Sequence, residues 1–491
     1  MVKTGGSRRR RRPAATLAII TLSTSLLSAA LTTSALAQQL PGPAEPGVPP
    51  VAPPEIPTPA VPPSVLPEVE PLAPPPGAEQ VRFVLSALTI DGVTVYAPES
   101  LEPLYAGLLG REVALTEIFA VAEAITAKYR SDGYIISRAV VPAQRIENGA
   151  VRIEVLEGFV DKVTVQGRAP AVLTDYVEQI RAVRPLTADA LERYLLLAND
   201  LAGVTARAVL SASPAVPQAA DLVVVVDDKP FDGFATLDNR GSRFVGPVQF
   251  QVGGRLNSPL GFGEQIEARA ITTSTTDELR FLELGVSAPI GPEGTMVALT
   301  GSTSRSEPGF TLEPLEIENK TDTVALAVTH PLLRTRASTL RVQGRFDYGN
   351  FDSDILGTRL SEDRLRVLRA NGSYDLVDPF AGVNLVSVEL SQGLDILGAR
   401  ETGSPDLSRA NGHSDFTKVT FAASRLQRVT ENINALAAAA GQYAFDPLLS
   451  SEEFGLGGPE FLRAFDPSEQ VGDHGLAGRL ELQFLVDVGE P

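Results

Sequence analysis

From about residue 229 onward, apolar and polar residues alternate along the chain in short segments. Val248, Phe250 and Val252 interleave with polar or small neighbours, and the pattern recurs at 282–288 and 386–390. A period of two is typical of a strand whose two faces meet different surroundings. We count about twelve such segments, each near the ~10 residues that a tilted membrane strand needs. The pattern favours a transmembrane antiparallel β-barrel over 229–491, and a soluble β-sandwich with shorter strands is the alternative.

A different pattern precedes the alternating region and occurs twice. Leu88-Thr89-Ile90-Asp91-Gly92 is matched 75 residues later by Val163-Thr164-Val165-Gln166-Gly167. Helical spacing follows in each copy, with Thr116 and Thr187 placed as N-caps. Two strands then close each copy, at 134–141 and 150–156 in the first, and at 204–211 and 221–227 in the second. The repeat predicts two small α+β domains, at 80–158 and 159–228, and a role as plain rigid spacers is the alternative.

The chain begins with a segment typical of export. A basic run from Arg8 to Arg12 is followed by an apolar stretch over 14–30 and by Ala35-Leu36-Ala37, which supplies small residues for cleavage. We interpret residues 1–37 as a secretory signal peptide, with a membrane anchor as the alternative. Residues 38–79 are rich in proline and predict an extended linker, which serves as a tether, a recruitment arm or a spacer.

Composition excludes several classes of function. The chain has no cysteine, which removes disulfides, thiolate metal sites and a cysteine nucleophile. Without the signal peptide it carries 36 basic and 60 acidic side chains, so nucleic acid is not an expected partner. Past the signal peptide no run of eighteen apolar residues occurs, so any membrane span has to be a β-strand. The three histidines are far apart in the sequence, and we expect neither a metal site nor a cofactor.

Three groups of residues form recognisable motifs. The first lies within 80–158 and includes Pro142, Gln144, Gly149 and Gly158. The second consists of Asp238, Asn239, Gly241 and Ser242, and the third is Leu462-Arg463-Ala464-Phe465-Asp466, near the end. Together they resemble one family, the two-partner secretion transporters of the outer membrane (TpsB, of the ShlB, FhaC and HecB type). The three motifs resemble, in order, the first POTRA domain of that family, the entry into its barrel, and the Val-Arg-Gly-Tyr/Phe signature of the long loop that folds back into the pore.

The resemblance implies a gating or plug role for this loop. In the family, the loop arginine is held by an acidic residue on the barrel wall, and Asp487 is the nearest candidate on the strand that follows. Ala464 replaces the family glycine, which costs ~1 kcal/mol if the site needs a positive φ. The resemblance also implies a barrel of sixteen strands, so with about twelve segments the chain is expected to lack the last strands.

The function that the resemblance implies is protein export and not an enzymatic activity. The POTRA domains, in the periplasm, would recognise an unfolded exoprotein of the adhesin or haemolysin type through its N-terminal secretion domain, by strand addition. The exoprotein would then pass through the barrel, which contacts outer-membrane lipid, without nucleotide. The alternatives are an outer-membrane protein assembly factor of the same superfamily and a passive porin.

Overall fold

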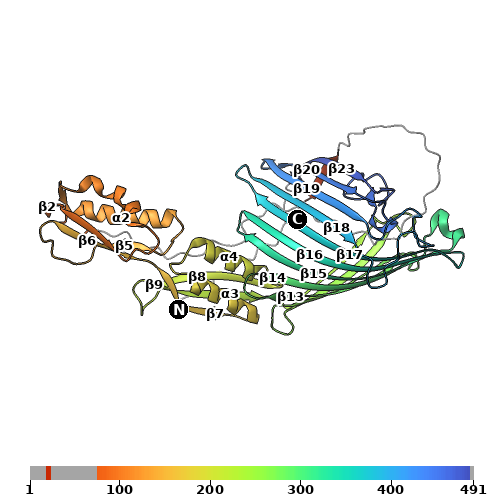
Figure 1. Ribbon diagram of the computed structural model, residues 1–491, viewed down its shortest axis with the longest axis horizontal. Coiled ribbons are helices and arrows are strands. Elements are labelled where there is room, and N and C mark those ends of the chain that lie inside the picture. The colour runs from red at the N-terminus through yellow and green to blue at the C-terminus, as the bar shows by residue number, and fades with distance from the viewer. Residues whose placement is uncertain (1–17, 24–73, 487–491) are drawn as a thin grey trace, which may run out of the picture.

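The alternating region forms one antiparallel sheet. The computed structural model describes residues 18–23 and 74–486. Each strand of this sheet pairs with the next along the chain, and β23 pairs with β20. The strands are β10 (Phe231–Asp238), β11 (Gln249–Asn257), β12 (Gln265–Thr273), β13 (Arg280–Ile290), β14 (Thr295–Ser306), β15 (Ile317–Arg334), β16 (Ser338–Ile355), β17 (Thr358–Val377), β18 (Gly382–Gly393), β19 (Thr417–Thr430), β20 (Ile433–Ala444) and β23 (Gly475–Val486). The predicted number of about twelve strands is confirmed, and Figure 1 shows them as one curved wall.

A thirteenth strand, β1 (Ala18–Ser23), lies antiparallel to β23, with Ala18 opposite Val486. These residues belong to the segment that the sequence assigns to a signal peptide. The rest of that segment, and the proline-rich linker up to residue 73, lie outside the described residues.

The wall exposes its apolar side chains and buries polar ones. Leu282, Leu284 and Val286 are 46%, 56% and 42% exposed on one face of β13. Charged side chains such as Lys418 and Glu481 are nearly fully buried on the opposite face of the wall. A soluble sandwich would show the reverse, because its apolar faces pack against each other. The burial pattern therefore supports the barrel wall, with lipid on the outside and a polar interior.

The first α+β unit lies at the far end of the molecule from the wall (Figure 1). Its three-stranded sheet has the order β3-β6-β5, and its core is covered by α2, which buries Ile118, Ile125 and Tyr129. Its elements are β2 (Arg82–Val84), β3 (Ala87–Asp91), α1 (Pro98–Leu101), η1 (Glu102–Leu104), η2 (Ala106–Leu108), β4 (Glu112–Ala114), α2 (Leu115–Ser131), β5 (Arg138–Val140) and β6 (Ala150–Leu156).

Two predictions for this first unit are wrong in detail. Helix α2 begins at Leu115, so Thr116 lies inside it; the N-cap is Ala114, whose N–H donates to the Glu117 carboxylate at 3.0 Å. The strand predicted at 134–141 is reduced to β5, because Tyr134 packs edge-on against Tyr96 and Tyr129 instead of joining the sheet. The strand predicted at 150–156 coincides with β6.

The second α+β unit repeats the same plan. It comprises β7 (Phe159–Gln166), α3 (Ala171–Ala182), α4 (Ala188–Asn199), β8 (Val204–Ala212) and β9 (Ala219–Asp228), with the sheet order β7-β9-β8. Thr187 is the N-cap of α4, as predicted, and its hydroxyl accepts a hydrogen bond from the N–H of Ala190 at 3.2 Å. The predicted strands at 204–211 and 221–227 correspond to β8 and β9.

The second unit is fixed to the turns at the near end of the wall. Arg334, at the end of β15, makes a bidentate contact with Asp200 at 2.8 and 2.7 Å. Arg193 and Tyr194 of α4 both bond to Glu293, in the turn between β13 and β14. A planar guanidinium that binds both carboxylate oxygens fixes orientation as well as distance. The unit therefore lies beside the ends of β13, β14 and β15 (Figure 1).

Long loops connect the other ends of the strands. The loop after β14 contains η3 (Phe310–Leu315), and the loop after β20 contains η4 (Ser450–Glu452) and the short pair β21 (Phe454–Leu456) and β22 (Gln470–Gly472). None of the helices in the described parts of the chain is long and apolar enough to cross a membrane.

Glu157, the residue after β6, bonds to the segment after β3 and to helix α2. Replacing it tests this fold. Its carboxylate accepts hydrogen bonds from the N–H of Thr94 and the hydroxyl of Tyr129, both at 2.8 Å. Burial of the carboxyl opposes ionisation, but the hydrogen bonds from Thr94 and Tyr129 prevail and lower the pKa of Glu157. We expect Glu157→Gln to cost about 1–2 kcal/mol at neutral pH, measured by hydrogen exchange of α2 in the full chain.

The effect of Glu157→Gln should depend on pH in a defined direction. Because the folded pKa is lowered, the ionised group stabilises the unit above its unfolded pKa of about 4.3. That contribution is lost as the pH falls through the folded pKa, so wild type and variant should converge there. Glu123→Gln, at an exposed position of α2, is the control. An equal loss in both variants would contradict the assignment.

Candidate functional site: a loop inside the wall

The loop between β20 and β23, residues 445–474, lies along the inner face of the wall and borders a cavity of about 880 Å³. The cavity is lined on one side by inward residues of β17 to β20 and β23, and on the other by loop residues 458–461 and 463–467. On β23 the lining residues are Arg479, Glu481 and Gln483, which share one face because side chains alternate along a strand. The cavity therefore lies between the loop and the polar interior of the wall.

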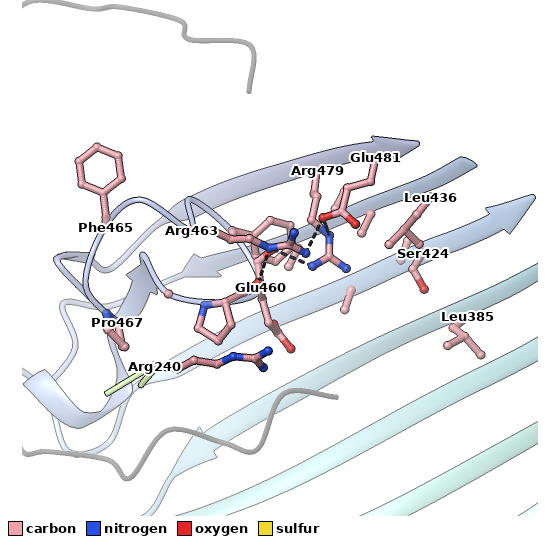
Figure 2. A pocket seen from close by; sticks show the side chains of 18 of the residues that line it. Arg240, Leu385, Ser424, Leu436, Glu460, Arg463, Phe465, Pro467, Arg479 and Glu481 are labelled. Carbon is pink, nitrogen blue, oxygen red and sulfur yellow. Dashed lines mark hydrogen bonds and ion pairs between the residues drawn. The ribbon is translucent and has the colours of Figure 1, made fainter. Parts of the chain in front are cut away.

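Arg463 lies opposite Glu481 across this cavity. Its Nη2 atom is 2.5 Å from Oε1 of Glu481, and Figure 2 shows the two side chains pointing toward each other. The Glu481 side chain is 2% exposed, whereas that of Arg463 is 40% exposed. A carboxylate buried this deeply requires a cation, because its desolvation is otherwise uncompensated. The pair therefore holds the loop against β23.

Two further cations contact the same part of the loop. Arg479 lies 3.5 Å from Glu481 and donates to the backbone oxygen of Glu460 at 3.0 Å. Arg243, in the loop between β10 and β11, donates to the Asp466 carboxylate at 2.5 Å. This part of the loop is thus bonded to the first hairpin of the wall, β10–β11, and to its last strand after the loop, β23.

The remaining residues of the predicted loop motif have different surroundings. Leu462 and Phe465 are 40% and 47% exposed, and Phe465 points away from Glu481 (Figure 2). Ala464 does not have a positive φ, so the strain expected for alanine there does not arise. The positive φ, 59°, is found at Leu462 instead. Asp487, the predicted partner of Arg463, lies outside the described residues, and the carboxylate that faces Arg463 is Glu481.

The predicted barrel-entry motif lies at the end of β10 and in the loop that leads to β11. Asp238 accepts a hydrogen bond from the N–H of Arg240 at 2.9 Å, and Ser242 accepts one from the N–H of Phe244 at 3.2 Å. Asn239 and Gly241 line the cavity. The motif thus positions Arg243 beside the long loop, and its own residues are mainly occupied in shaping the turn.

The predicted POTRA-motif residues organise the first α+β unit. Gln144 bonds through its side-chain amide to the backbone of Arg152 at 2.7 and 2.8 Å, and so pairs with β6 as another strand would. Pro142 lies at the start of that segment and accepts a weak contact from Gln144 at 3.4 Å. A Cβ at Gly149 would lie 2.0 Å from the oxygen of Val84, and a Cβ at Gly158 would lie 2.6 Å from that of Ile136. Their roles are therefore in backbone packing.

A metal centre has no support in the part of the chain that the structure describes. No group of three or more His, Asp or Glu side chains converges there as a set of ligands. The carboxylates near the loop face arginine and lysine instead, so this site is built for ion pairing.

The sequence matches two families along most of its described length. Residues 221–488 match the family described as haemolysin secretion/activation protein ShlB/FhaC/HecB, and residues 83–158 match the POTRA domain of ShlB type. The chain belongs to the ShlB/FhaC/HecB family. The resemblance inferred from the motifs is therefore confirmed, and members of this family are outer-membrane transporters of two-partner secretion. The family places the barrel in the outer membrane and the POTRA-type units in the periplasm.

Individual relatives and structures agree with this family. The heme/hemopexin transporter protein HuxB of Haemophilus influenzae (strain 86-028NP) is 24% identical over 388 residues, which cover 77% of this chain and 68% of the relative. The hemolysin transporter protein ShlB of Serratia marcescens is also 24% identical, over 83% of this chain and 73% of its own. The structure of CdiB from Escherichia coli has the same fold, with a TM-score of 0.69, 23% identity, and coverage of 85% of this chain and 78% of that one.

Glu481 was not singled out from the sequence, although a signal for it exists. Arg479 and Glu481 are two residues apart on a predicted strand, so they share the face that points away from lipid. An acidic residue on that face, directly after the long loop, is a candidate partner for a loop arginine. The sequence alone does not show how far the loop carries Arg463 into the interior of the wall, and so does not show which carboxylate it meets.

The Arg463–Glu481 pair predicts a coupled effect on channel closure. Arg463→Ala and Glu481→Gln should each raise the open probability in planar bilayers about tenfold, corresponding to ~1.4 kcal/mol for a partly exposed pair. The double variant should add little to either single variant, because both remove the same interaction. Glu460→Gln, in the same cavity lining, should leave the open probability unchanged. Additive effects would mean that the two residues act separately.

Proposed function

We propose that this chain exports an unfolded exoprotein of the adhesin or haemolysin type through its barrel. The observation that carries the proposal is the ion pair between Arg463 and the buried Glu481, which holds a long loop across the interior of the wall. Water can replace each partner of an ion pair, so the loop can be released without any covalent change. This suits a plug that opens for each substrate. Family membership and the names of HuxB and ShlB support an exported protein as the partner.

In this proposal the periplasmic units capture the exoprotein by strand addition. Strand β8 has a hydrogen-bonded neighbour, β9, on one side only within the described residues. Its outward face includes Val209, which is 40% exposed, and the neighbouring β9 presents Val225, which is 41% exposed. A free edge beside apolar side chains offers both main-chain bonds and side-chain contacts to an extended N-terminal secretion segment. The bidentate Arg334–Asp200 contact would keep that edge beneath the barrel.

Each segment of the chain has a role in the proposed function. Residues 1–37 act as a signal peptide, 38–79 as a linker, 80–158 and 159–228 as two POTRA domains, and 229–491 as the barrel. The exposed apolar face of the wall contacts outer-membrane lipid. Export needs no nucleotide, nucleic acid or cofactor, and the chain performs no catalysis of its own.

Secretion of a candidate exoprotein, the product of a gene next to this one, tests the proposal. The two proteins are produced together in a host that lacks related transporters, and the exoprotein is measured in the medium. We expect secretion with the full chain and a loss of at least tenfold when β8 is blocked by Val209→Pro, because proline removes an N–H and bends the edge. Val223→Ala, which lies opposite Val209 on β9, is the matched control in the same sheet.

The same experiment separates the alternatives. If the exoprotein stays in the periplasm while the amounts of other outer-membrane barrels fall in a strain without this gene, the chain is an assembly factor. If it stays there and small solutes pass freely through an ungated channel, the chain is a passive porin. Either outcome contradicts the export proposal.

A further inference from the structure

The loop of residues 445–474 consists of two parts that are held in different ways. We call residues 445–456 and 470–474 the root and residues 457–469 the tip. The two strands of the root, β21 and β22, pair with each other, with Leu456 opposite Gln470. Gly457 and Gly458 then connect root to tip with φ of 122° and 95°, values that other residues rarely adopt. A change of direction is therefore built in where the tip begins.

The root contains a buried ion cluster centred on Glu452. Its side chain is 8% exposed and lies between Arg369 of β17 and Lys418 of β19, each at 2.7 Å from one carboxylate oxygen. The backbone oxygen of Glu452 accepts hydrogen bonds from Lys418 at 2.8 Å and from Gln442 at 3.0 Å. Arg369, Lys418 and Gln442 of the wall are thus paired with the carboxylate and backbone oxygens of Glu452. These pairs are shielded from water, and electrostatic interactions are strong in such surroundings.

The root is also packed by apolar contacts and by a neighbouring loop. Leu448 and Leu449 are completely buried against Leu365, Val367 and Phe416. Arg409, in the loop between β18 and β19, donates to the backbone oxygen of Leu448 at 2.7 Å and lies 3.3 Å from Glu453. Breaking this arrangement would leave several charges and carbonyl groups unpaired at once.

The tip is held by more exposed contacts. Arg463 and Arg243, which bind Glu481 and Asp466, have side chains that are 40% and 53% exposed. The guanidinium sides of both pairs are accessible to water and are screened by salt, and Arg479, 3.5 Å from Glu481, stays beside that buried carboxylate when Arg463 leaves. Elements with few buried contacts open at the lowest free energy, and so the tip should open well before the root.

We propose that only the tip moves when the channel opens, and that Glu452 is a positioning residue which keeps the root in place through Arg369 and Lys418. This inference rests on the proposed function, because it specifies how the same loop is regulated. The root then remains as a fixed strut beside the export path, and the tip swings about Gly457 and Gly458. Opening requires the loss of the Arg463 and Arg243 contacts and of the hydrogen bond from Arg479 to the backbone oxygen of Glu460, and it leaves the Glu452 cluster intact.

Engineered cross-links test this division, because the chain has no cysteine of its own. Ser408→Cys/Ser450→Cys links the root to the neighbouring loop, since Oγ of Ser408 accepts from the N–H of Ser450 at 3.0 Å. A second root pair, His413→Cys/Leu448→Cys, uses bridged backbone positions. Arg243→Cys/Asp466→Cys, joined by a bismaleimide with a reducible spacer, links the tip to the first hairpin.

Channel openings are recorded in planar bilayers in KCl before and after reduction of each cross-link. We expect the root disulfides to change the opening frequency less than twofold. The tip cross-link should lower it at least tenfold, with recovery on reduction, and the reduced state of each protein controls for folding. Openings abolished by a root disulfide, openings that persist with the tip linked, or no openings in any reduced variant would each overturn the inference.

A second measurement addresses Glu452 itself. In Glu452→Gln, the Ser408→Cys/Ser450→Cys disulfide should form at least fivefold more slowly in air, because the root is no longer held in place. Glu452→Asp, which keeps the charge, should restore much of the rate, and Glu460→Gln in the tip should leave it unchanged. An unchanged rate in Glu452→Gln would exclude a positioning role.

Secretion of the exoprotein, measured in the same variants, separates this inference from the proposed function. If the cross-links act on conductance as expected but no exoprotein reaches the medium in any reduced variant, export is excluded while the division of the loop stands. If secretion occurs in the reduced variants and a root disulfide stops it, export stands and the division fails.

Discussion

The structure depends on one constraint, which is that backbone N–H and C=O groups in lipid have to be paired within the protein. Consecutive pairing from β10 to β20 and on to β23 satisfies these groups along the wall. The same pairing sends alternate side chains outward and inward, so that Leu284 meets lipid and Glu481 meets the interior. The interior is therefore the place where charged residues such as Arg369 can be collected without contact with lipid. A loop that enters this interior finds carboxylates and guanidinium groups as partners, and ion pairing is the natural way to hold it.

The strands were predictable from the alternation of apolar and polar residues along the sequence. Features that depend on packing between distant segments were not. The alternation of apolar residues is enough to predict about twelve strands, and β6 begins and ends at the predicted residues, Ala150 and Leu156. Thr187 was predictable as a cap, because its hydroxyl is placed to accept a hydrogen bond from the first turn of α4. Thr116 was not, because Glu117 reaches back to the N–H of Ala114 and moves the start of α2. Tyr134 leaves its expected strand because an aromatic cluster holds it.

For the site, resemblance identified Arg463 but not its partner. Asp487 was chosen as the nearest candidate on the strand after the loop, whereas Glu481 faces Arg463 because it is on the inward face of β23 at the depth that the loop reaches. The Glu452 cluster was hidden for another reason. Its members come from β17, β19, β20 and the loop root, and their side chains converge only when the wall curves. No local pattern marks such a cluster in advance.

The attachment of the second periplasmic unit adds a mechanical consequence. Arg334 and Asp200, together with Glu293 and its two partners on α4, fix that unit to the turns of the wall. The two periplasmic units are also in contact, since Ile135 and Ile136 of the first pack against the core of the second. An arm joined in this way has little freedom to swing without breaking these contacts. In the proposed export function, binding at the arm acts chiefly by delivering an extended chain to the mouth of the barrel, where the partly exposed contacts of Arg463 and Arg243 open first.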